Sequence, residues 1–268
     1  MLGALTGDIV GSIYERNNIK STEFPLFQDS CRFTDDSVLT VALADAIMTG
    51  APYDDTMRHY YRSYPDAGYG RGFVAWAESE APKPYNSWGN GAAMRVSPVG
   101  WACDTLADAL CMARNYTLPT HGHPEGVKGA QAVAGAVFLG RSGASKDELR
   151  SFIAGEFGYD LALSCDEIRP SYRFDVSCQG TVPQAVTAFL ESNDFEGAIR
   201  LAVSLGGDSD TLACITGAIA EAFYGGVPAC IAERTMGFLD DRLRRVTVAF
   251  KARFVAGRFA AAKGQALK

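Results

Sequence analysis

The segment LGGDSDTLACITGAIAEAFYG, residues 205–225, places two aspartates directly before a stretch that is apolar on every side. Between residues 212 and 223 the sequence has no polar stripe of the kind that a surface helix carries. Because a helix that is apolar all round lies inside a protein, this pattern predicts a central, buried helix. The carboxylates of Asp208 and Asp210 then lie at a buried helix end, where they are costly unless hydrogen bonds or cations neutralise them.

A second apolar segment, RFTDDSVLTVALADAI, begins in the same way with Thr34, Asp35 and Asp36. Asp, Ser and Thr are common N-caps, and carboxylates are stabilised at the positive end of a helix, so either pattern alone is equally consistent with ordinary capping. One cap residue is enough for one helix, however, and each segment carries two carboxylates and a threonine, which is Thr211 in the later segment. We therefore expect the two helix ends to converge on one site.

Converging carboxylates repel one another and raise each other's pKa values unless a cation keeps them ionised. The side chains on offer are hard oxygen donors with no Cys or His beside them, a set that favours Mg²⁺ or Mn²⁺ over zinc. Two clusters suggest two cations, which lie roughly 3.5–4 Å apart in hydrolytic sites. The residues thus predict a divalent-cation site in front of the central helix.

A third acidic segment, GDIVGSIYE, carries Asp8 and Glu15. These residues are seven apart, so two helical turns leave them on roughly the same side. Gly7 and Gly11 share one helix face and allow close backbone packing. Asp8 is equally consistent with a buried hydrogen-bonding residue, and the alternative for Glu15 is a solvated acid at a helix end.

Helical patterns dominate the chain, and the best strand candidate, residues 172–178, is short. The longest irregular stretch, residues 64–91, is rich in glycine and is a candidate functional loop. No linker or repeat divides the sequence. We expect an all-α protein, a compact orthogonal bundle of helices with one domain over residues 1–268 and a central site for two metal ions. The helices are expected at residues 2–14, 37–48, 56–64, 105–115, 127–139, 146–157, 183–191, 195–204, 212–224, 228–236 and 239–262.

Composition narrows the functional classes. The chain is 47% hydrophobic and 21% charged, as in ordinary globular proteins, and its formal net charge of −6 disfavours a nucleic-acid surface. No apolar run reaches the roughly 18 residues of a membrane span, and no signal peptide is visible at the N-terminus. The seven cysteines form no CxxC pair and are an odd number, which is typical of a reduced compartment. We expect a cytoplasmic protein.

With these segments in place, the chain resembles the ADP-ribosylglycohydrolase family, which includes the dinitrogenase reductase-activating glycohydrolase and the ADP-ribosyl-acceptor hydrolases. The resemblance runs from residue 2 to about residue 254, and its motifs are specific in their ordered combination. In chain order they are GDIVGSIYE, FTDDS, GYGRG, GNGAAMR, HGHP and GGDSDT. The resemblance implies an all-α hydrolase that uses two Mg²⁺ or Mn²⁺ ions to cleave the bond between ADP-ribose and a modified acceptor.

The same resemblance implies roles for individual residues. Glu15 matches an acid/base candidate on a mobile flap, and Asp36 is the second catalytic candidate. The implied metal ligands are Thr34, Asp35, Asp36, Asp208, Asp210 and Thr211. The implied substrate-binding residues are Gly68, Gly70, Gly72, Ser87, Trp88, Gly89, Asn90 and His123.

These substrate roles agree with the chemistry of ADP-ribose, because glycine lets backbone N–H donors approach a diphosphate closely. Trp88 or Phe73 is a candidate for packing on the ligand, although core or loop packing explains either aromatic equally well. Arg95 is expected to hydrogen-bond inside the protein. Of the two histidines in HGHP, we expect His123 to contact the ligand and His121 to be structural.

The partners implied are an ADP-ribosylated protein or other ADP-ribosylated acceptor, with ADP-ribose as the product, no membrane, and nucleic acid only as a modified acceptor. GSIYE and GGDSDTLA are more similar to the serine-directed, O-linked branch than to the arginine-directed one, but Leu212 alone does not decide the acceptor. A haloacid-dehalogenase phosphatase is disfavoured because DSDTL lacks the required glycine and strand. The serious alternative is a non-catalytic ADP-ribose binder or a crystallin-like structural protein, and the complete ligand set disfavours it.

Overall fold

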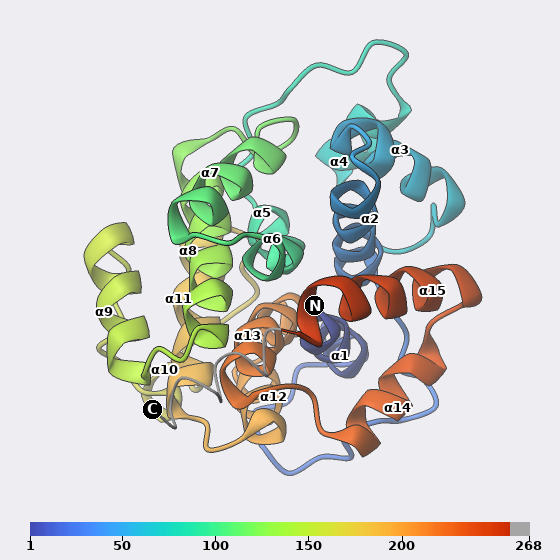
Figure 1. The fold of residues 1–268 in the computed structure, drawn as a ribbon. Helices are drawn as coiled ribbons and strands as arrows, with labels where there is room; N and C mark the ends of the chain where they lie inside the picture. Colours follow the sequence, from blue (N-terminus) through green and yellow to red (C-terminus); the bar gives the residue numbers. More distant parts are fainter. Residues whose placement is uncertain (258–268) are drawn as a thin grey trace.

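The computed structural model describes residues 1–257, and within that range the protein is built from helices, as the sequence predicts (Figure 1). Residues 258–268 of the expected domain lie outside the described residues. The helices are α1 (Leu2–Gly11), α2 (Asp35–Thr49), α3 (Tyr53–Ser63), α4 (Arg71–Glu78), α5 (Gly91–Met94), α6 (Ser97–Ala102), α7 (Leu106–Thr117), α8 (Pro124–Arg141), α9 (Lys146–Phe157), α10 (Cys165–Ile168), α11 (Cys178–Glu191), α12 (Phe195–Ser204), α13 (Ser209–Tyr224), α14 (Ala229–Phe238), α15 (Asp241–Phe250) and the π-helix η1 (Lys251–Val255).

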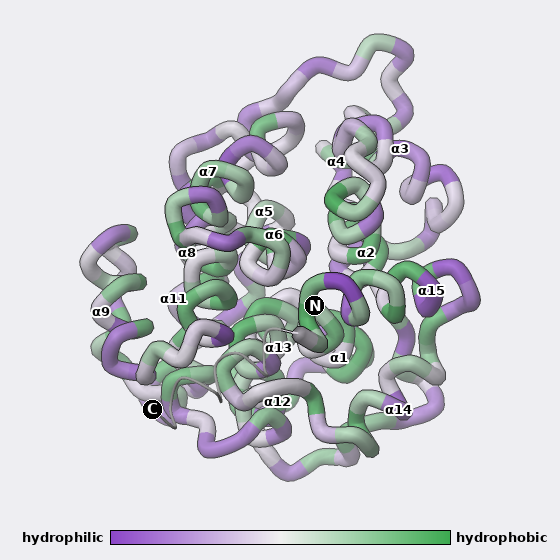
Figure 2. The backbone as a smooth tube through the Cα atoms, in the orientation of Figure 1, coloured by the Kyte–Doolittle hydropathy of each residue, from purple (hydrophilic) through white to green (hydrophobic). Residues whose placement is uncertain are grey.

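Helix α13 is the central element, and every residue from Ser209 to Ala222 is buried. Helices α1, α8, α11 and α12 pack around it, and the hydropathy colouring shows apolar residues gathered along α1 and α13 (Figure 2). The helix ends at Gly225, whose φ of 81° is the left-handed conformation that glycine adopts without strain. The apolar segment at residues 212–223 therefore forms the buried helix expected for it.

Glycines bring α1 against α13. A Cβ atom at Gly7 would lie 1.9 Å from the carbonyl oxygen of Ala213, and one at Gly3 would lie 2.1 Å from that of Gly217. No side chain fits at such separations, so the two backbones touch directly. This contact sets Asp8 on α1 beside the first turn of α13.

Helix α2 begins at the same end of the molecule. Thr34 caps it by accepting a hydrogen bond at its side-chain oxygen from the N–H of Asp36, at 3.3 Å. Asp35 and Asp36 form its first turn, where the helix dipole favours negative charge. The N-termini of α2 and α13 and the C-terminal half of α1 thus face one another.

Some expected elements are wrong. Residues 172–178 form no strand: the backbone there is irregular and makes one isolated bridge, between Gly89 and Ser177. Helix α11 begins at Cys178, five residues before Pro183, because Ser177 caps it and α11 carries the proline in its interior. The expected helix at residues 239–262 is α15, capped by Asp240, followed by η1. Its last five residues lie beyond the described part of the chain.

Four short helices, α4, α5, α6 and α10, were not expected. Three of them lie between residues 71 and 102, where glycine, proline and few apolar repeats hide a helical period. Among residues 1–257, no helix is both long and apolar enough to cross a membrane.

Candidate active site

A cavity of about 660 Å³ opens at the first turns of α2 and α13, beside the segment that follows α1. Its size is that of a pocket for a nucleotide-sized ligand. Its lining includes the six predicted metal-binding residues, which the structure brings together from two segments far apart in the sequence: Thr34, Asp35, Asp36, Asp208, Asp210 and Thr211.

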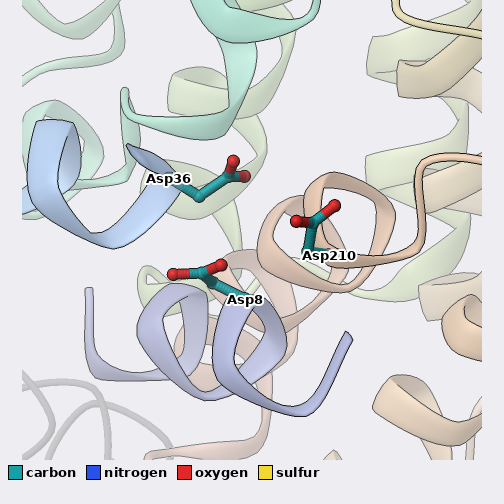
Figure 3. Close-up of side chains that lie close together, drawn as sticks. All are labelled: Asp8, Asp36 and Asp210. Carbon is teal, nitrogen blue, oxygen red and sulfur yellow. The ribbon is translucent and has the colours of Figure 1, made fainter. Parts of the chain in front are cut away.

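Three carboxylates from three different helices point toward one another (Figure 3), and two of them, those of Asp36 and Asp210, line this cavity. Each of Asp8, Asp36 and Asp210 offers an oxygen atom, and these atoms lie within 4.8 Å of one another. All three side chains are buried. Such a cluster is unfavourable when ionised unless a positive charge is present.

Asp8 is the member of this cluster whose oxygens are occupied by hydrogen bonds. It accepts from the N–H and hydroxyl of Thr34, at 2.9 and 2.6 Å, and from the N–H of Ser37 at 3.1 Å, together with the Ser37 hydroxyl. Burial raises the pKa of Asp8 and these bonds lower it again. The alternative that Asp8 is a buried hydrogen-bonding residue is therefore confirmed: it fastens the start of α2 to α1.

Asp36 is hydrogen-bonded at one oxygen only. Its Oδ2 accepts from the Thr211 hydroxyl at 3.3 Å, whereas its buried Oδ1 has no hydrogen-bond partner among residues 1–257. Burial, followed by the charges of Asp8, Asp35 and Asp208, raises the pKa of Asp36 well above its usual value. A buried, unpaired carboxylate oxygen is costly, and a cation ligated there would satisfy it.

The other carboxylates show the same electrostatics. Burial and the neighbouring Asp8 and Asp208 raise the pKa of Asp35 to about 8. Burial and the charges of Asp208, Asp36 and Asp8 raise the pKa of Asp210 well above its usual value. With hard oxygens as the donors, the cluster fits Mg²⁺ or Mn²⁺, which would remove the repulsion behind these shifts.

Asn90 joins the segment of Asp208, predicted to bind metal, to the loop of residues 87–90, predicted to bind substrate. Its Nδ2 donates to Asp208 Oδ2 at 2.7 Å and lies 3.1 Å from the Thr181 hydroxyl. Asn90 is buried and lines the cavity with Ser87 and Gly89. Three of the four predicted residues of this loop therefore face the cavity.

The glycine loop, residues 68–72, lies beside the first segment predicted to bind metal, residues 34–36. Gly68, with a φ of 108°, would place a Cβ only 3.4 Å from Asp35 Oδ1, and the N–H of Asp35 donates to the Ala67 carbonyl at 2.8 Å. Gly68, Gly70 and Gly72 all line the cavity. Phe73 also lines it, but its ring stacks on Tyr69 at 5.1 Å, so it forms part of the wall.

Trp88 and His123 are not among the residues that line the cavity. Trp88 is 53% exposed, and its ring lies 5.5 Å from that of His123. His123 accepts the N–H of Glu125 and caps α8. The two rings form a neighbouring surface and not a part of the cavity wall.

His121 lies in the wall instead. As expected, Arg95 is buried and hydrogen-bonds internally, to the Thr120 hydroxyl at 2.5 Å and to His121 Nδ1 at 3.1 Å. Burial and the Arg95 charge lower the pKa of His121 well below its usual value, which favours the neutral ring. His121 and Arg95 both contribute to the cavity lining.

Glu15 lines the cavity from the segment after α1. Burial raises its pKa, while Arg16, whose Nη2 lies 3.1 Å from Glu15 Oε1, lowers it. Asn18 holds this segment in place: its Nδ2 donates to Gly207 O at 2.9 Å and its Oδ1 accepts the Gly207 N–H at 2.8 Å. Gly207 directly precedes Asp208, so the Glu15 segment is tied to the second segment predicted to bind metal.

Several lining residues were not predicted from the sequence. Arg71 lies inside the GYGRG motif at residues 68–72, from which only the glycines were predicted as binding residues. Phe174 and Val176 fall in the segment predicted as a strand, and their exposure was not predictable from it. Charged and exposed apolar side chains are among the unpredicted lining residues: Arg16, Arg32, Asp66, Arg71, Phe174 and Val176.

The fold and site define an all-helical protein whose central cavity has a floor of carboxylates. The family model for ADP-ribosylglycohydrolases matches residues 1–260, and the chain belongs to this family. ADP-ribosylhydrolase ARH3 of Mus musculus is 26% identical over 305 residues, covering 84% of this chain and 82% of that protein.

Two further relatives cover most of the chain. ADP-ribosylarginine hydrolase Tri1 of Pseudomonas putida (strain GB-1) is 24% identical over 265 residues, covering 85% of this chain and 71% of that protein. A solved structure named as an ADP-ribosylglycohydrolase-related protein complex superposes with a TM-score of 0.68 at 25% identity, covering 93% of this chain and 95% of that chain. The fold and the family resemblance expected from the sequence are thus confirmed.

Proposed function

We propose that this protein is a divalent-cation-dependent hydrolase that releases ADP-ribose from an O-linked acceptor, of the serine type, in the cytoplasm. The observation that carries the proposal is the buried cluster of Asp8, Asp36 and Asp210 with its unpaired Asp36 oxygen, two of whose members, Asp36 and Asp210, line a cavity of about 660 Å³. The family and the names of both kinds of relative support the removal of ADP-ribose.

The ligands of the proposed pair of Mg²⁺ or Mn²⁺ ions are Thr34, Asp35, Asp36, Asp208, Asp210 and Thr211. When bound, such ions supply a positive charge that orients ribose hydroxyls and a water near the anomeric carbon. The chain itself fixes the ligands before substrate arrives, because Asp8 anchors the Thr34 segment and Asn90 anchors Asp208. Preorganised charges of this kind account for much of enzymatic rate acceleration.

The substrate lies along the cavity in the proposal. Backbone N–H groups near Gly68, Gly70, Gly72 and Gly89, with the Ser87 and Asn90 side chains, take the diphosphate and ribose. Trp88 and His123 extend this path beyond the cavity, where two adjacent rings suit a flat base. The cavity volume of about 660 Å³ fits the ribose and diphosphate end of the ligand.

Glu15 is the proposed general acid. Asp36, which is also a proposed metal ligand, is the second catalytic candidate. As the bond between the anomeric carbon and the acceptor oxygen breaks, the Glu15 carboxyl gives its proton to that oxygen. A water then adds to the anomeric carbon and its proton returns to Glu15, so the sum is hydrolysis. The raised pKa of Glu15 favours the protonated form that this step needs.

The proposal is tested by a release assay on peptides ADP-ribosylated at serine or arginine, and on ADP-ribosylated nucleic acid ends. Each acceptor is assayed with excess Mg²⁺, with EDTA, and with EDTA followed by Mn²⁺. We expect release from the serine-linked peptide that EDTA stops and Mn²⁺ restores. Binding of ADP-ribose without release from any acceptor would favour the non-catalytic alternative.

A further inference from the structure

Two arginines flank Glu15 at the mouth of the cavity. Arg16 follows it in the chain and pairs with it, and the positive charges of both Arg16 and Arg32 lower the pKa of Glu15. Both arginines line the cavity. In the proposed function the acceptor leaves from the side of Glu15, so these two arginines lie beside the acceptor.

The positive charge at the mouth is available to a ligand. The Arg16 side chain is 79% exposed, and an ion pair this exposed to water exchanges readily for another. Neither Arg32 nor Arg71, which is also exposed and lines the cavity, forms an ion pair with any residue of the described part of the chain. Outside the predicted metal ligands, whose carboxylates the proposed cations would neutralise, the lining carries the exposed Arg16, Arg32 and Arg71 against the carboxylates of Glu15 and Asp66, which leaves an excess of positive charge.

An apolar surface adjoins these charges. The Arg16 guanidinium lies 5.6 Å from the centre of the Phe174 ring, and Phe174 and Val176 are 48% and 52% exposed. Large apolar side chains left exposed together with arginine are typical of binding surfaces. The positive charge of Arg16 and Arg32 beside this apolar surface is a local feature, because the protein as a whole has a formal net charge of −6.

We propose that the acceptor is an acidic peptide segment, whose carboxylates near the modified residue contact Arg16 and Arg32 while its backbone crosses Phe174 and Val176. This inference rests on the proposed function for the position of the acceptor. Like charges facing each other across an interface are unfavourable, so the same arginines disfavour an acceptor with basic residues or a modified arginine. Charge complementarity thus selects among the acceptors that the family resemblance leaves open.

The test uses two peptides with the same ADP-ribosylated serine, one flanked by glutamates and one by lysines. We expect kcat/KM for the acidic peptide to exceed that for the basic one by about tenfold at low ionic strength, with a smaller ratio at high salt. Affinity is measured in parallel with peptides that carry a non-hydrolysable linkage, so that the charge preference is read without turnover.

The charge-reversal variants Arg16→Glu and Arg32→Glu, alone and together, should abolish or invert the ratio between the two peptides. Arg114→Glu is the matched control, because Arg114 is exposed on α7, does not line the cavity, and changes the net charge equally. Equal affinity for both peptides in the unaltered protein, or an unchanged ratio in the double variant, would overturn the inference. A charge-dependent affinity without turnover of either peptide would support it and contradict the proposed function instead.

Discussion

Glu15 and Asp36 both reach the cavity, but their surroundings suit them to different tasks. Glu15 lies at the half-buried edge with a basic neighbour, whereas Asp36 is buried among other carboxylates. A carboxyl group with a raised pKa outside the ligand set is suited to carry a proton. A carboxylate inside the set is suited to hold a cation.

Glu15→Gln should keep ADP-ribose and metal binding and lose on the order of 10²–10⁴-fold in turnover, the usual contribution of a general acid. Glutamine has the same shape and cannot give up a proton. Affinity for ADP-ribose and the release rate are measured on one preparation. Turnover near that of the unaltered protein would remove Glu15 from the chemistry and leave Asp36 as the remaining catalytic candidate.

The rate should also depend on pH through Glu15. A general acid acts in its protonated form, so activity falls as the pH rises through its pKa, which burial has raised. Because Arg16 lowers this pKa, Arg16→Ala should shift the alkaline fall in rate to higher pH. A pH–rate profile for each variant measures the shift, and an alkaline limb at the same pH in both would contradict the assignment.

Hydrogen bonds between elements hold Glu15 over the site. Asn18 both donates to and accepts from the Gly207 backbone, and it also donates to the Tyr14 carbonyl at 2.7 Å. Asn18→Asp keeps the acceptor and loses the donor, so we expect a fall in kcat of several-fold to about tenfold, with ADP-ribose affinity kept. Asn17→Ala is the control, because Asn17 is the exposed neighbour. A loss in both variants, or an equal loss of ADP-ribose affinity in Asn18→Asp, would show a structural role only.

The packing of α1 against α13 also positions the site. Gly7→Ala should lower the free energy of unfolding by about 1–3 kcal/mol, because its Cβ would lie 1.9 Å from Ala213 O and the helices must separate. The displacement should also weaken metal binding, since Asp8 holds the Thr34 segment and would carry it away from Asp210. Gly155→Ala on α9 is the control: a Cβ there meets nothing within 4 Å, and alanine is the better helix former. Thermal unfolding with and without Mg²⁺ compares them, and a Gly7→Ala protein as stable as the control would contradict the packing account.

Elements with a strong local signal were predictable from the sequence. The boundaries of α9 and α12 follow from their Ser145 and Asp194 caps, and the burial of α13 follows from its composition. Helices α4, α5 and α6 were not predictable, because short helices in a glycine- and proline-rich stretch are stabilised by tertiary packing and not by a periodic pattern. The convergence of the two acidic helix N-termini could be expected from the sequence. The anchoring role of Asp8 could not, because it depends on hydrogen bonds from Thr34 and Ser37 in another part of the chain.

At the scale of the whole molecule, stability and function should be linked through the cations. A ligand that binds only the folded protein stabilises it by about 2.7 kcal/mol at a concentration 100-fold above its Kd. Mg²⁺ or Mn²⁺ should therefore raise the unfolding temperature of chelator-treated protein by several degrees. A titration that leaves this temperature unchanged at millimolar concentrations would contradict cation binding.

The central claim is that the carboxylate cluster holds the cations on which ADP-ribose release depends. Asp210→Asn tests it most directly, because asparagine resembles the protonated acid in shape and removes one ligand charge without a change of volume. The measurement is ADP-ribose release from a serine-linked peptide by chelator-treated protein as Mn²⁺ is added back. We predict that the unaltered protein recovers its activity while the folded variant does not. Full activity of the unaltered protein in the chelator, or full recovery by Asp210→Asn, would contradict the account.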